Sequence, residues 1–114
     1  MSEVERILDQ YDRAMHGDAW HGDNVWCILD TVEPQQAFVR LLDERHTIWE
    51  LVTHMTFWET VVRRRLEGVT SKPDERLNFP LTPEASRKNW EIALQEFRAS
   101  NDSFRKAVAA LNDA

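Results

Sequence analysis

The sequence contains little of several residue types, and each scarcity excludes a class of function. It has one cysteine, Cys27, so no disulfide forms within the chain, and the apolar neighbours of Cys27 predict a buried small hydrophobe. Its three glycines are isolated, which excludes a glycine-rich phosphate loop. No apolar run has membrane-spanning length, and the first residues lack the basic and apolar stretches of a signal peptide. We therefore expect a cytoplasmic protein without membrane partners.

Positive charge is also scarce. Lys and Arg number 14 against 20 Asp and Glu, which gives a formal net charge of −6. Because nucleic-acid affinity depends largely on neutralising phosphates, this balance argues against a nucleic-acid partner. The basic run Arg63-Arg64-Arg65 lies in a predicted helix beside Glu67, where a solvated helix face explains it better than a binding patch.

The composition suits one all-α domain spanning residues 1–114, with 42% apolar residues and five Trp and five Phe to fill a core. Apolar residues recur at helical spacing in three long segments, and no strand-like alternation competes with them. The first helix is expected from about Ser2, as N-cap, to Met15. The second begins at Thr47 with a Thr47–Glu50 capping box and ends at Gly68. The third begins with Thr82 as N-cap and Pro83 at its first position.

Shorter elements are expected between the long helices. Val25 to about Thr31 predicts a short helix, and Pro34 opens another short turn. Residues 37–45 fit either a helix or an irregular packed segment. Residues 69–81 predict a loop that Phe79 and Leu81 hold against the bundle.

The second long helix is predicted to be central, because its apolar arc covers more than half of its circumference. The residues expected to line its main face are Ile48, Leu51, Val52, Met55, Trp58, Val62 and Leu66, with Phe57 and Val61 widening the arc. In the third helix, Asn101 interrupts an otherwise apolar stripe.

Three stretches together resemble the DinB/YfiT-like superfamily. The first is Trp20-His21-Gly22, and the third is the Thr82-Pro83 helix that carries Trp90. The second is the run from His46 to Gly68, which contains in order an N-cap, a Trp-Glu-Leu sequence, a histidine and a Trp-Glu pair. The resemblance implies an up-down-down-up four-helix bundle, shortened here to three long helices plus one or two short ones.

In that family a divalent metal, often zinc or nickel, is commonly held by three histidines. One comes from the second helix, which His54 matches, and two come from a His-x-x-x-His pair on a final helix. The chain ends at Ala114, about where that helix is expected, so the pair has no counterpart. The resemblance therefore implies a metal-dependent hydrolase or thiol-transferase-like ancestry with an incomplete metal site and an unknown small-molecule substrate.

Other residues are candidates to complete the site. Glu50 precedes His54 by one helical turn and is a candidate orienter or second ligand, and His21 is a candidate from the preceding loop. The competing interpretation of His54 is a half-buried histidine satisfied by a hydrogen bond, because a metal centre needs about three ligands.

Two functions from different classes remain open at this point. In the first, the chain is a helical module that forms a homodimer, because three helices of a four-helix fold leave one apolar face uncovered. In the second, it is a metal-dependent enzyme whose site is completed by His21, Glu50 or a symmetry mate. A serine or cysteine nucleophile has no support, because the chain has no Gly-x-Ser-x-Gly motif and no base close to Cys27 in the sequence.

Overall fold

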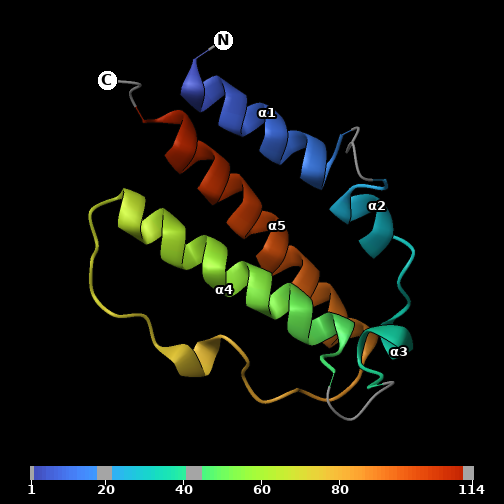
Figure 1. The fold of residues 1–114 in the computed structure, drawn as a ribbon. Helices are drawn as coiled ribbons and strands as arrows, with labels where there is room; N and C mark the ends of the chain where they lie inside the picture. The colour runs from blue at the N-terminus through green and yellow to red at the C-terminus, as the bar shows by residue number, and fades with distance from the viewer. Residues whose placement is uncertain (1, 18–21, 41–44, 112–114) are drawn as a thin grey trace.

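The computed structural model describes residues 2–17, 22–40 and 45–111, and these residues contain helices and no strand (Figure 1). The three long helices are α1 (Glu3–Met15), α4 (Ile48–Leu66) and α5 (Arg87–Ala109). Two short helices, α2 (Val25–Leu29) and α3 (Pro34–Ala37), precede α4, and one 3-10 turn, η1 (Glu75–Leu77), lies between α4 and α5. The predicted all-α class, with three long and two short helices, is confirmed.

The helices α4 and α5 lie side by side and run in the same direction, with α1 antiparallel to them (Figure 1). This is the order up, down, down that the resemblance implied for the first three helices. Parallel neighbours cannot be joined by a tight turn. The connection, residues 67–86 (the return link), must instead travel back along α4, whose 19 residues span about 28 Å.

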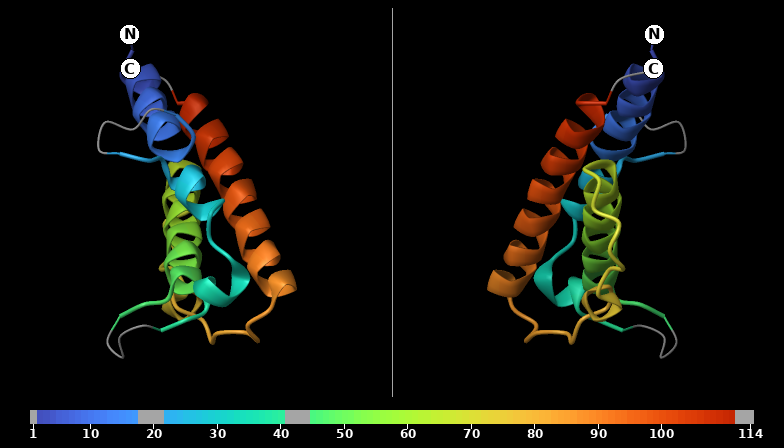
Figure 2. Two further views of the ribbon diagram at one scale, coloured as in Figure 1. Left: turned by 90° about the vertical axis from the view of Figure 1, so that its right-hand side faces the viewer. Right: turned by 90° about the vertical axis from the view of Figure 1, so that its left-hand side faces the viewer.

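Side views show α2 and α3 covering one side of the α4–α5 pair, with the start of α1 and the end of α5 at the same end (Figure 2). Between these helices lies a core dominated by aromatic rings. Its buried residues are Trp26, Leu29, Ala37, Trp49, Val52, Trp90, Ala93 and Phe97. In the described part of the chain, no helix is both long and apolar enough to cross a membrane.

Local hydrogen bonds explain where two of the long helices begin, as predicted. The Ser2 side chain caps α1 together with Glu5. At the start of α4, the Thr47 hydroxyl accepts from the Glu50 N–H at 3.0 Å, and the Glu50 carboxylate accepts from the Thr47 N–H at 2.9 Å. The helix ends before Gly68, whose φ of +91° lies in the region that favours glycine.

The predicted start of the third long helix at Thr82 and Pro83 is wrong. Its N-cap is Ser86, whose hydroxyl accepts from the Asn89 N–H at 3.1 Å. The Asn89 side chain also donates to the Glu84 carbonyl at 2.8 Å, which holds the residues before the helix in a non-helical path. The helix therefore begins at Ser86, the candidate cap that is nearer to Trp90, the first core residue of α5.

Two side-chain predictions are also wrong. Cys27 is exposed, because Trp26 and Leu29 turn the buried side of the short helix α2 toward the core and leave Cys27 on its other side. Leu81 is 97% exposed and holds nothing, whereas Phe79 does contact the bundle, as described below.

The apolar arc of α4 is divided among different neighbours. Its buried apolar residues are Trp49, Val52, Phe57 and Val61. From the predicted main face, Leu51, Trp58 and Val62 are instead 45%, 38% and 43% exposed. The central position predicted for α4 therefore leaves one apolar side open.

Candidate functional site

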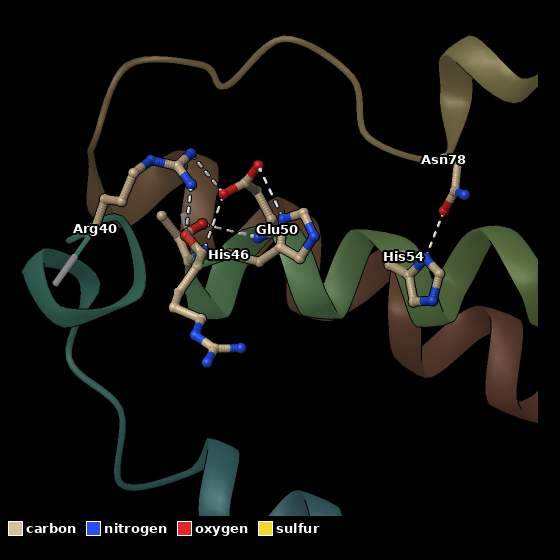
Figure 3. Close-up of polar contacts among 7 residues, drawn as sticks. Arg40, His46, Glu50, His54 and Asn78 are labelled. Atoms are coloured by element: carbon tan, nitrogen blue, oxygen red, sulfur yellow. Dashed lines mark hydrogen bonds and ion pairs between the residues drawn. The ribbon is translucent and has the colours of Figure 1, made fainter. Parts of the chain in front are cut away.

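His54 lies on the side of α4 that faces the return link. Its Nδ1 is 2.5 Å from Oδ1 of Asn78, and because a carbonyl oxygen only accepts, Nδ1 is the donor (Figure 3). In the neutral imidazole, Nε2 then carries the free lone pair. Metal-binding histidines usually have their second ring nitrogen held by such a hydrogen bond. The arrangement therefore fits both interpretations of His54, a metal ligand and a half-buried histidine satisfied by a hydrogen bond.

Phe79 holds the return link to α4 by stacking on two imidazoles. Its ring centroid is 4.9 Å from that of His54 and 4.3 Å from that of His46, with the ring planes within 8° of parallel in both pairs. The expected anchoring of the 69–81 loop by Phe79 is therefore confirmed.

Glu50 is engaged at the start of α4 rather than beside His54. Its Oε1 accepts from the Thr47 N–H and from the Arg40 guanidinium at 2.7 Å, and its Oε2 lies 3.7 Å from Nδ1 of His46 (Figure 3). Burial alone would raise the pKa of the Glu50 carboxyl, but the Thr47 N–H and Arg40 hold that pKa below its ordinary value. No hydrogen bond or ion pair among the described residues joins Glu50 to His54.

The third predicted ligand, His21, lies outside the described residues. Within the described ranges, no three His, Cys, Asp or Glu side chains gather closely enough to hold a metal ion. A catalytic metal centre needs about three protein ligands and an open position. The residues that the structure describes therefore do not make a complete site for the metal that the resemblance implies.

A polar network centred on Glu59 joins four helices inside the bundle. The Tyr11 hydroxyl donates to Oε2 of Glu59 at 2.5 Å, and the Ser100 hydroxyl and Asn101 amide donate to Oε1 at 2.9 and 2.8 Å. Asn101 in turn accepts from the indole N–H of Trp26 at 2.8 Å. These five residues (the Glu59 network) come from α1, α2, α4 and α5, so the network fixes how the helices are placed relative to one another.

The sequence offered one signal of this network, the amide of Asn101 within the apolar stripe of α5. The partners were not predicted, because Glu59 and Trp26 lie 42 and 75 residues away along the chain. Burial, and then the hydrogen bond to Glu59, raise the pKa of Tyr11, so its hydroxyl stays protonated as the donor.

The open side of α4 carries four apolar residues at steps of four, three and four: Leu51, Met55, Trp58 and Val62 (the α4 stripe). A hollow lined only by apolar side chains of α2, α4 and the residues between α2 and α3 borders Leu51 and Met55. A second hollow borders Met55, Trp58 and Val62 and reaches Met15 of α1. Because Met55 lines both hollows, they form one continuous and largely apolar surface along α4, which His54 and Glu59 also border.

The sequence profile described as the DinB superfamily matches residues 19–114, which is most of the chain. No curated protein and no solved structure matches this chain.

Proposed function

This chain belongs to the DinB superfamily, and from that premise we propose that it is a self-associating helical module whose two copies pair through the α4 stripe. The observation that carries the proposal is the exposure of three of the four stripe residues, Leu51, Trp58 and Val62, around the half-buried Met55. Large apolar side chains that lie together on an exposed surface usually mark an interaction site.

The spacing of the stripe supports a helical partner. Steps of four, three and four residues are those of the contacting positions in a coiled coil, which keep one seam facing a neighbouring helix. Leu51 and Val62 are eleven residues apart, so the stripe is about 16 Å long, or three helical turns. A partner helix of ordinary length would cover it.

A second copy of the chain is the occupant that we propose. The four stripe residues carry no charge, and Glu59, which borders the same surface, already accepts hydrogen bonds from Tyr11, Ser100 and Asn101. Two identical stripes can therefore meet about a two-fold axis through uncharged side chains. The hollows on either side of Met55 offer room for Trp58 of the partner copy. Aromatic anchors of this kind commonly dominate the energy of protein interfaces.

Sedimentation velocity over a range of concentrations tests the proposal. The unchanged chain should show a concentration-dependent dimer. Trp58→Glu and Val62→Glu should each weaken dimerisation at least ~100-fold, because each would bury two unpaired carboxylates in the interface. Leu81→Glu is the matched control, since Leu81 is an exposed apolar residue outside the stripe.

Two results would contradict this function. One is a folded chain that stays monomeric at every concentration. The other is a dimer that Leu81→Glu weakens as much as Trp58→Glu does, because the stripe would then have no special role.

A second candidate is a metal-dependent protein in which His54 supplies one ligand. The hydrogen bond from its Nδ1 to Asn78 favours this candidate, because it leaves Nε2 available. The remaining ligands would come from His21 or from a second copy. Metal content after incubation with zinc or nickel should approach one ion per chain or per dimer and be lost in His54→Ala but kept in His46→Ala. Absence of metal from the unchanged protein would reject this candidate.

A further inference from the structure

A separate hollow of about 270 Å³ lies between the C-terminal half of α4 and the return link. The apolar residues that line it are Phe57, Val61, Val69, Pro73 and Leu77. It shares no lining residue with the α4 stripe, so a ligand here and a second copy on the stripe would use different sides of α4.

Three cations line the same hollow: Arg64, Arg65 and Lys72. Within the described ranges, no carboxylate pairs with any of them. The neighbouring cations differ, because Arg63 pairs with Glu67 at 2.7 Å and Arg76 pairs with Asp74 at 3.0 Å. The pairing of Arg76 also occupies Asp74, the one acidic residue in the lining.

The unpaired cations stand out against the charge of the whole chain. Residues 63–76 contain five Lys or Arg and three Asp or Glu, although acidic residues outnumber basic ones, 20 to 14, in the full sequence. An acidic protein has ample carboxylates for surface pairing, yet these three cations remain together beside an apolar surface. Their arrangement is complementary to a ligand that brings its own negative charge.

We propose that this hollow binds a small amphipathic organic anion, with an aliphatic or aromatic body against the apolar lining and an anionic head group between Arg64, Arg65 and Lys72. The volume lies just below the range of drug-sized pockets, which suits a molecule of about ten non-hydrogen atoms. Guanidinium groups bind carboxylates and phosphates through paired, charge-assisted hydrogen bonds. The ligand therefore needs both parts, because the body supplies apolar burial and the head supplies the contacts with the cations.

Titration with octanoate, followed by calorimetry and by amide chemical shifts, tests the proposal. Octanoate should bind, with its largest shifts in residues 64–77. Octanamide, which has the same tail and no charge, and inorganic phosphate, which has charge and no tail, should each bind at least about ten-fold more weakly. Phenyl phosphate serves as the second anionic probe, and tighter binding of it than of octanoate would support the site and assign the head group to phosphate.

Matched variants separate this site from general charge effects. The double variant Arg64→Gln/Arg65→Gln should weaken octanoate binding at least about ten-fold, whereas Arg63→Gln, which removes the paired neighbour, should change it less than about two-fold. Leu77→Ser should also weaken binding, and because Leu77 is exposed its replacement leaves the core intact. Circular dichroism confirms that each variant is folded.

Four results would overturn the proposal. Three concern affinity: no octanoate binding by the folded chain, equal affinities for octanoate and octanamide, and equal losses in Arg63→Gln and in the double variant. The fourth is a set of shifts centred on Ile28 and Leu51, because they would place the ligand on the apolar surface that includes the α4 stripe.

Discussion

Replacing Asn101 by leucine tests whether the Glu59 network holds the bundle together. Asn101 lies in the apolar stripe of α5, where leucine would continue the pattern of its neighbours. The side chain is buried, accepts from Trp26 and donates to Glu59. A purely apolar account of the core predicts that leucine stabilises the fold, whereas the network predicts that it destabilises the fold.

The magnitudes decide between these effects. Burying leucine in place of the amide contributes at most about 2 kcal/mol. Against this gain, the buried indole N–H of Trp26 loses its acceptor, which costs about 1–3 kcal/mol, and the Glu59 carboxylate loses one donor, which costs about 1.5–3 kcal/mol. We therefore expect Asn101→Leu to lower the free energy of unfolding by about 2 kcal/mol, a large part of the 5–15 kcal/mol typical of a domain.

Urea denaturation followed by circular dichroism measures this loss. Asn89→Leu is the control, since the Asn89 amide donates to Glu84 at the exposed end of α5 and should cost less than about 1 kcal/mol. In a Trp26→Phe background the cost of Asn101→Leu should fall, because no indole N–H is then left without an acceptor. An Asn101→Leu protein as stable as the unchanged chain would refute the reasoning.

Three further predictions concern stability. Because the pKa of Tyr11 is raised, its neutral form is favoured in the folded state, and the free energy of unfolding should fall as the pH rises above about 10. The loss should be less than about 1.4 kcal/mol per pH unit, because the group is half-exposed. The urea midpoint of Tyr11→Phe should fall less steeply with pH than that of the unchanged chain. The lowered pKa of Glu50 has the opposite effect on the pH dependence: the ionised carboxylate stabilises the fold above pH 4.5, and this stabilisation is lost below it. Glu50→Gln should therefore flatten the decline in melting temperature on acidification. An unchanged decline would count against a stabilising Arg40–Glu50 pair. Gly68→Ala should cost about 1–2 kcal/mol because φ is +91°, and an unchanged thermal midpoint would contradict that assignment.

Much of the fold was predictable because its signals are local. The capping box at the start of α4 joins Thr47 and Glu50, three residues apart, and each long helix shows its apolar spacing within a few turns. The start of α5 was misplaced because Thr82 and Ser86 are both plausible caps. The choice between them depends on the Asn89–Glu84 contact, which composition does not reveal.

The candidate site was less predictable because its contacts are distant in the sequence. The apolar arc of α4 is so wide that periodicity cannot tell which part other elements cover, and the part predicted as the main face includes the exposed stripe. His54 was identified from the resemblance alone. Its partner Asn78 lies 24 residues away in a loop whose path only the tertiary structure specifies.

The parallel arrangement of α4 and α5 explains where the return link, the hollow beside it and the α4 stripe lie. A parallel pair requires a connection as long as the helices themselves, and here that connection lies against α4, where Phe79 and Asn78 hold it. The return link thus lies over Phe57 and Val61 and forms one wall of the hollow that Arg64, Arg65 and Lys72 line. The α4 stripe lies on a different side of the helix, where Met55 packs partly against the core and Leu51, Trp58 and Val62 stay exposed. The proposed ligand and the proposed second copy would therefore contact α4 through different residues, so variants of the hollow should not change self-association.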